Sequence, residues 1–159
     1  MKKYLVLLLG FWGTLALQAQ VLTVAKEFGD NLRLFALTDS DEYREKVEDL
    51  FSSGARITDE LVFALVSRSN YPKEKSYHFE TYLNLIEKDS LDIKLIDFII
   101  IENSLIEGDT KTNEQKSRAE YVSCRLKVRG SVSLDTRELI IFRNGRITKI
   151  GKYPQTSQQ

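Results

Sequence analysis

The chain has 159 residues, 23 basic and 23 acidic side chains, and a formal net charge of zero. This length suits one domain with one core, and the lack of a basic excess argues against a nucleic-acid-binding or anionic-membrane-binding surface. Cys124 is the only cysteine, so the chain forms no internal disulfide and burial must stabilise its core. We expect the Cys124 thiol to be buried and inert, the alternative being a bond between two chains.

The first 19 residues have the pattern of a cleavable signal peptide. Two lysines precede an apolar run from Tyr4 to Leu17, which is too short to span a bilayer comfortably. The small residue Ala19 then offers a cleavage point. The sequence therefore predicts that residues 1–19 are removed and that the protein is exported, to the periplasm or to the outside medium. An uncleaved membrane anchor is the alternative interpretation, and we expect no stable anchor.

The mature part of the chain opens with helical periodicity. Apolar residues recur every three or four positions in four successive segments, which is the spacing of one helix face. The expected helices run from about Val21 to Leu37, from Asp39 to Gly54, from a Thr58 cap over Leu61 to Val66, and from Phe79 to Lys88. A short strand is expected at Ala55 to Ile57, and the third helical segment could instead pair as strands. Gly29, inside the first helix, indicates a close packing contact.

From Leu91 onward the hydrophobic period changes from helical to alternating. Leu91 to Ile101 is apolar on both faces along its middle, so we expect a central strand, whereas Arg118 to Val128 alternates and has one core face. Leu139 to Phe142 and Ile147 to Ile150 flank Asn144-Gly145, the strongest signal for a two-residue hairpin. Helices followed by an antiparallel meander predict an α+β fold.

Three segments carry a resemblance to a known family, namely LFSSGARITDE (Leu50 to Glu60), ETYLNLIEK (Glu80 to Lys88) and LIIFRNGRITKIGKY (Leu139 to Tyr153). With the order of elements, they resemble the NTF2-like domains, also called cystatin-like or SnoaL-like, and in particular exported bacterial domains of undefined function. The resemblance implies a cone in which N-terminal helices pack in a curved antiparallel sheet. It implies one domain over residues 20–153, followed by a polar tail over 154–159, and it hardly constrains the activity.

Two acidic residues are candidates for chemistry. Asp97 interrupts an apolar strand, where an ionised carboxylate is costly unless it is paired. In ketosteroid isomerases, which the fold resembles, a strand carboxylate and a helix tyrosine line the cone, which implies Asp97 with Tyr82 or Tyr121. Alternatively, Asp97 faces solvent or pairs with Arg125. Asp59 lies near the family's position for a catalytic acid or base, although its simpler role is a negative charge at a helix N-terminus.

His78 is the only histidine, which excludes any mechanism or metal site that needs two. It could carry a proton, or it could be a partly exposed packing residue at a helix start. The sequence contains no zinc pattern, phosphate loop, dinucleotide fingerprint or nucleophile elbow, so we expect no metal and no cofactor. The catalytic candidates are Asp97, Asp59 and His78, and the candidate ligand-binding residues are Tyr82, Tyr121, Asp97 and Arg125.

Two functions remain open. The favoured one is an exported, non-catalytic module that binds a small ligand or a protein, and the family resemblance implies a homodimer through the sheet face. The alternative is a ketosteroid-isomerase-like or SnoaL-like enzyme that transfers protons in the cone. An enzyme needs an open apolar cavity with convergent polar groups, whereas a binding module can fill its cone with side chains. The large residues expected to face inward favour a filled cone; they are Phe28, Phe35, Phe51, Phe79 and Tyr82.

Overall fold

The computed structural model describes residues 2–101 and 119–154. In chain order, the elements in these ranges are α1 (Lys2–Thr38), α2 (Asp41–Glu48), β1 (Phe51–Thr58), α3 (Glu60–Ser67), β2 (Tyr77–His78), α4 (Phe79–Glu87), β3 (Leu91–Ile101), β4 (Glu120–Gly130), β5 (Leu134–Arg143) and β6 (Arg146–Lys152). Helices come first and the long strands follow, so the α+β class is confirmed. None of the helices in the described ranges combines the length and apolar character needed to cross a membrane.

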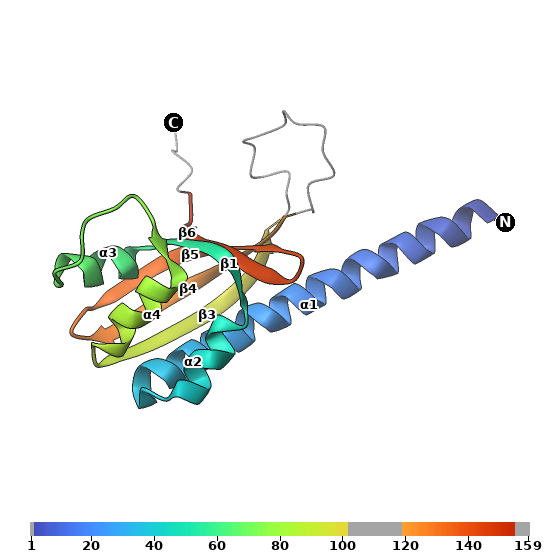
Figure 1. Cartoon of the computed structure of the whole chain (residues 1–159). Helices are drawn as coiled ribbons and strands as arrows, with labels where there is room; N and C mark the ends of the chain where they lie inside the picture. Colours follow the sequence, from blue (N-terminus) through green and yellow to red (C-terminus); the bar gives the residue numbers. More distant parts are fainter. Residues whose placement is uncertain (1, 102–118, 155–159) are drawn as a thin grey trace.

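The strands form one curved sheet in the order β2-β1-β6-β5-β4-β3 (Figure 1). From β3 to β6 it is the antiparallel meander that the sequence predicts, and both turn residues of the β5–β6 hairpin, Asn144 and Gly145, have positive φ. The sheet is nevertheless mixed, because β1 pairs with β6 in parallel, with Ile57 opposite Ile150. Most of the chain lies between these two strands, which gives the connection the length that a parallel pairing requires.

Strand β3 lies at the edge of the described sheet, so the expected central position was wrong. One of its faces is apolar because α1 packs closely on it. A Cβ added at Gly29 of α1 would lie 3.1 Å from the Leu95 Cβ and 3.3 Å from the Phe98 ring. On the other face Ile99 remains 50% exposed. The apolar character of this strand therefore reflects contact with a helix, and the Gly29 contact is present as expected.

The helices fill the concave side of the sheet, and Figure 1 shows α1, α2 and α4 on one side of it. The predicted stripe of α1 is buried, and it consists of Val21, Ala25, Phe28, Leu32 and Phe35. Helix α2 ends at Glu48 and not at Gly54, because Phe51 already begins β1 and buries its ring. These helices and the sheet form the α+β architecture that the sequence predicts.

Helix α1 continues through the segment expected to be a signal peptide. Figure 1 shows its N-terminal part extending away from the sheet, and Leu15 and Leu17 are exposed. Burial against the domain is established at Val21. Removal of residues 1–19 stays a prediction, and it would leave the buried stripe of α1 in place.

Candidate functional site

A cluster of buried polar side chains lies inside the cone, where the start of α3 and the middle of α4 face the inner side of the sheet. Its members are Asp59, Tyr82, Cys124 and Glu138, each at most 1% exposed. They come from four different elements, so only the folded chain brings them together. We call Asp59 and Glu138 the buried acid pair. The charge of Asp59 raises the pKa of Glu138, and the charges of both residues raise the pKa of Tyr82.

Asp59 is the N-cap of α3. Its Oδ1 accepts a hydrogen bond of 2.8 Å from the backbone N–H of Val62, the contact expected of an acidic residue at this position. Burial raises the pKa of Asp59 to about 6, although the hydrogen bonds from Val62 and from the Tyr82 hydroxyl act in the opposite direction. The sequence places Asp59 correctly at a helix N-terminus, and the structure adds that this terminus is buried.

Glu138 is the strand carboxylate of the cluster, and the sequence analysis did not identify it. It lies opposite Cys124 in the β4–β5 register, on the inner face of the sheet. Its Oε1 accepts a hydrogen bond of 2.7 Å from the Thr136 hydroxyl, whereas its buried Oε2 has no partner in the described part of the chain. Burial, followed by the negative charge of Asp59, raises the pKa of Glu138 to about 8.

One signal could have found Glu138. On β5, Thr136, Glu138, Ile140 and Phe142 alternate with outward residues, and the last two are plainly apolar. Period-two alternation counted back from Phe142 therefore places Glu138 on the core face. A glutamate in an inward position is unusual, and this mismatch between residue type and strand face is the sequence signal that indicates Glu138.

Tyr82 and Cys124 complete the cluster as neutral groups. Burial and the charges of Asp59 and Glu138 hold the pKa of Tyr82 well above its usual value. Burial likewise raises the pKa of Cys124 to about 12, with a further contribution from Glu138. The Cys124 thiol is free and buried, as expected, and it is a poor nucleophile in this state.

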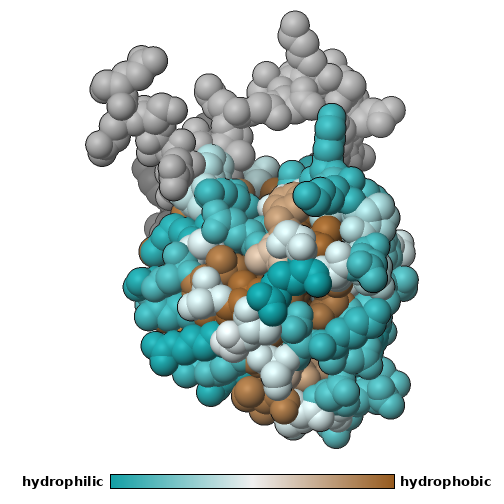
Figure 2. Space-filling view, turned by 90° about the vertical axis from the view of Figure 1, so that its left-hand side faces the viewer, coloured by the Kyte–Doolittle hydropathy of each residue, from teal (hydrophilic) through white to brown (hydrophobic). Residues whose placement is uncertain are grey.

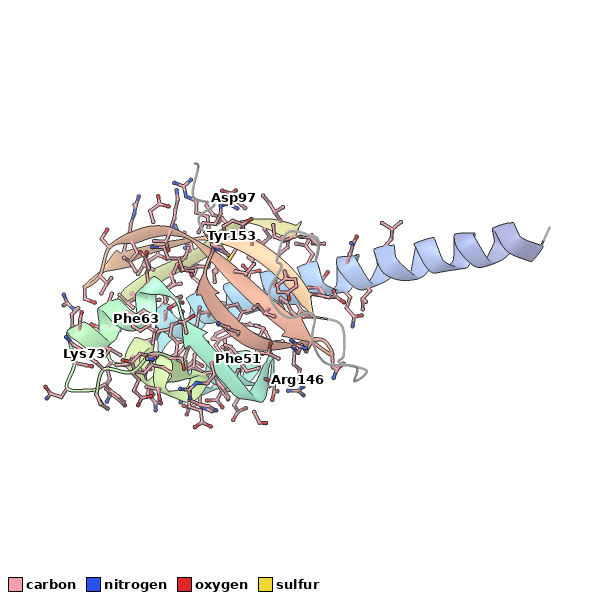
Figure 3. All side chains as sticks on the ribbon, turned by 90° about the horizontal axis from the view of Figure 1, so that it is seen from above. Phe51, Phe63, Lys73, Asp97, Arg146 and Tyr153 are labelled. Atoms are coloured by element: carbon pink, nitrogen blue, oxygen red, sulfur yellow. The ribbon has the colours of Figure 1, made fainter. Side chains whose placement is uncertain are left out.

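The other candidate acid, Asp97, lies away from this cluster. It has a φ of 56° at an irregularity in the β3–β4 pairing between Ile96 and Ile99, and this bulge turns its side chain out into solvent. Figure 3 shows Asp97 at the periphery of the molecule, distant from Phe63 of α3. The structure therefore follows the alternative that Asp97 faces solvent, and it does not bring Asp97 to Tyr82.

Arg125 and Tyr121 lie on the outer face of β4. The Arg125 guanidinium holds Asp135 through bonds of 2.6 Å and 2.8 Å, and this pairing raises the pKa of Arg125, with a smaller contribution from Asp97. Tyr121 stands between Ile101 and Ile141 in the strand register and is partly exposed. The expected ligand-binding set is thus divided, with Tyr82 inside the cone and the other three residues outside it.

His78 is the N-cap of α4. Its Nδ1 accepts a hydrogen bond of 3.4 Å from the Glu80 N–H, and its Nε2 lies 2.8 Å from the Ser53 carbonyl oxygen, to which it donates in the neutral form. The ring also packs on Phe79, with centroids 4.6 Å apart. One ring nitrogen therefore caps α4 and the other joins this helix to β1.

Two surface hollows lie outside the cone cluster. A cleft of about 320 Å³ separates α1 from the β5–β6 hairpin, and a shallower hollow of about 470 Å³ lies along α1 and α2. The first is lined by Leu17, Gln20, Val21, Val24, Glu120, Phe142, Asn144 and Gly145. Neither lining contains a candidate site residue. Among the described residues, no three histidine, cysteine, aspartate or glutamate side chains are grouped so that they could hold a metal ion.

Comparisons with known proteins add a likeness of fold. No protein-family model and no curated protein matches the chain. Among solved structures, the chain is similar to one described as a "putative ketosteroid isomerase" from Kribbella flavida, with 10% sequence identity and a TM-score of 0.44. The alignment covers 89% of this chain and 82% of that one. At this identity and TM-score the likeness assigns no activity to the chain.

Proposed function

We propose that the protein is an exported, non-catalytic binding module that binds its partner on its outer surface. The observation that supports this function is the filling of the cone. The five large residues expected to face inward are each at most 7% exposed; they are Phe28, Phe35, Phe51, Phe79 and Tyr82. The Phe51 ring contacts Phe28 at 5.5 Å and stacks on Phe79 at 4.9 Å between centroids. A substrate would have to displace these side chains to reach the buried acid pair.

The outer face of the sheet offers a surface for a protein partner. Ile101, Tyr121 and Ile141 lie side by side on β3, β4 and β5, and Ile99 adds a half-exposed side chain beside them. We call these four residues the outer row. By contrast, Figure 2 shows that the hydrophobic groups on the face it displays are separated by hydrophilic ones. A continuous row across three strands suits a flat protein interface better than scattered groups do.

The partner proposed for the outer row is a second copy of the chain. An isologous dimer pairs one patch with itself, and the row is apolar without a net charge of its own. The neighbouring Arg125–Asp135 pair supplies both signs of charge at its border, so two copies related by a two-fold axis can meet without repulsion. Such an interface should bury at least about 1,200 Å² in total to be stable.

Sedimentation velocity over a range of protein concentrations tests this function. We expect a concentration-dependent dimer for the chain and a monomer for Tyr121→Glu, because the new carboxylate would be buried in the interface. Lys73→Glu, on the loop between α3 and β2, is the matched control and should dimerise normally (Figure 3). A chain that stays monomeric at every concentration, or a Tyr121→Glu variant that still dimerises, would overturn the proposed partner.

A proton-transfer enzyme is the second candidate function, and one observation favours it. Asp59, Glu138 and Tyr82 meet inside the cone, and burial raises the pKa of each of them. Carboxyl groups with raised pKa values can exchange protons near neutral pH. A substrate could reach them only if α3 or the phenylalanines moved.

Deuterium exchange at the α-carbon of a panel of ketones, followed by NMR, separates the two functions. The binding-module proposal gives exchange no faster than buffer alone. If the protein accelerates the exchange and Glu138→Gln abolishes that acceleration, the binding-module proposal is wrong and the enzyme function is supported. The exposed variant Asp97→Asn is the control and should leave any such exchange unchanged.

A further inference from the structure

Within residues 2–101 and 119–154, no cation forms an ion pair with either member of the buried acid pair. Asp59 is 1% exposed and Glu138 is 0% exposed, and the Glu138 Oε2 lacks a hydrogen-bond partner in the described part of the chain. An ionised Glu138 carboxylate loses its hydration in this position, and the hydrogen bond from Thr136 satisfies only one of its two oxygens. A proton bound to Glu138 Oε2 neutralises the carboxylate, so this oxygen is where we expect the proton to bind.

The charged and titratable groups around the pair come from every element packed against it. They are Glu60 on α3, Tyr82 on α4, Cys124 on β4 and Lys152 on β6, while Arg137 on β5 acts on the neighbouring Cys124 thiol. The two cations bind elsewhere, since the Lys152 ammonium holds Glu60 at 2.5 Å and the Arg137 guanidinium donates to the Ser123 hydroxyl at 2.9 Å. Glu60 adds a further negative charge near the pair.

We infer that Asp59 and Glu138 form a buried proton-binding site that couples the folding of the domain, and the seating of α3 in particular, to pH. Near neutral pH the folded chain holds a proton on the Glu138 carboxyl group, whose Oε2 is buried without a partner in the described residues, and the unfolded chain releases this proton. This inference is independent of the proposed function, because it concerns the folded domain itself and needs neither a partner nor a substrate.

The direction of the pH dependence follows from the two pKa values. Burial raises the pKa of Asp59 to about 6 and that of Glu138 to about 8, both above their usual values. Between about pH 4 and pH 8 the folded chain thus binds more protons than the unfolded chain. The stabilisation is complete below about pH 4 and is lost as the pH rises through about 8.

Helix α3 is the element that we expect to be destabilised first when the pH rises above about 8. Asp59 holds the Val62 N–H at the start of this eight-residue helix, so repulsion between two ionised carboxylates bears directly on its first turn. The Lys152–Glu60 ion pair ties the same turn to β6 but lies at the surface, where such pairs contribute little. Hydrogen exchange of the Val62 amide should therefore report the release of the proton.

Urea unfolding of the full chain between about pH 5 and pH 9 is the first test. We expect the equilibrium constant for folding to fall by about tenfold or more across this range. Glu138→Gln should flatten the dependence, and the exposed carboxylate variant Asp97→Asn should keep it. Near pH 7, calorimetry in two buffers of different ionisation enthalpy should show uptake of about one proton on folding.

Exchange at Val62 is the second test. Above about pH 8, after correction for the intrinsic rate, its protection should fall in the wild-type chain and persist in Glu138→Gln. If Glu138→Gln does not fold, the proton uptake that calorimetry measures for the wild-type chain tests the inference by itself. Stability that is flat between about pH 5 and pH 9, or a dependence that survives unchanged in Glu138→Gln and Asp59→Asn, would overturn the inference.

Discussion

The Tyr82 hydroxyl acts on the buried acid pair from α4. Its hydrogen bond lowers the pKa of Asp59, in opposition to burial. We expect Tyr82→Phe to raise the pKa of Asp59 further and to reduce the free energy of unfolding by about 1 kcal/mol, the usual effect of losing one buried hydrogen bond. A ¹³C NMR titration of the carboxyl carbons and a urea unfolding curve measure the two effects.

Tyr43→Phe, on the half-buried face of α2, is the control for this variant and should change neither quantity. An Asp59 titration that is the same in Tyr82→Phe and in the wild-type chain would show that the hydroxyl does not act on the carboxyl group.

Substitution of Asp97 should, unlike that of Tyr82, leave the stability of the domain almost unchanged. Its carboxylate is exposed, and its positive φ is one that asparagine adopts as readily as aspartate. We expect Asp97→Asn to change the free energy of unfolding by less than about 0.5 kcal/mol. Thermal unfolding measures this change, and a loss above about 2 kcal/mol would indicate a buried hydrogen-bond network at this position.

Residue patterns predicted the roles of Asp59 and Tyr82 better than those of Asp97 and Glu138. A helix start and a helical stripe are local features, so the sequence places Asp59 at the N-terminus of α3 and Tyr82 on an inward stripe. The expected cap was Thr58, and the structure has Asp59 as the N-cap. The side of a strand on which a residue lies depends on an unbroken alternation. The bulge at Asp97 breaks that alternation on β3, whereas on β5 the alternation holds and carries Glu138 inward.

Helix α1 packs closely on β3 at Gly29. A Cβ at Gly29 would meet Leu95 and Phe98 at 3.1 Å and 3.3 Å, so a branched side chain must push the two elements apart. We expect Gly29→Val to destabilise the domain by about 1 to 3 kcal/mol. Urea unfolding measures the difference.

Gly54 on β1 provides the matched control, because an added Cβ there meets no atom within 4 Å. Gly54→Ala should be neutral, or stabilising by up to about 1 kcal/mol through the unfolded state. Equal effects of the two substitutions would mean that α1 does not pack on β3 as closely as described.

The sequence predicts elements more successfully than it predicts their pairing. The β5–β6 hairpin and the stripe of α1 follow from neighbouring residues, and both are present. The parallel β1–β6 pairing joins segments that are distant in the chain, and no local pattern encodes it. The edge position of β3 was missed because a helix covers one of its faces, which produces the same two-sided apolar pattern as a central strand.

At the scale of the whole molecule, the side chains of residues 15–20 are exposed, and the buried stripe of α1 begins at Val21. Because burial is established at Val21, removal of the predicted signal should leave folding intact. Mass spectrometry of the exported protein should find its N-terminus at Gln20, or within about two residues of it. Recovery of the exported protein with Met1 still in place would contradict the predicted cleavage.

Strand β3 is the last strand of the sheet in the part of the chain that the structure describes, and Asp97 interrupts it. An apolar strand of 11 residues at the edge of the described sheet is a template on which a strand of another molecule can pair. A left-handed residue with a charged side chain in its middle breaks the straight run of backbone donors and acceptors that such a strand would use. We therefore expect Asp97 to disfavour growth of the domain into β-aggregates through this edge.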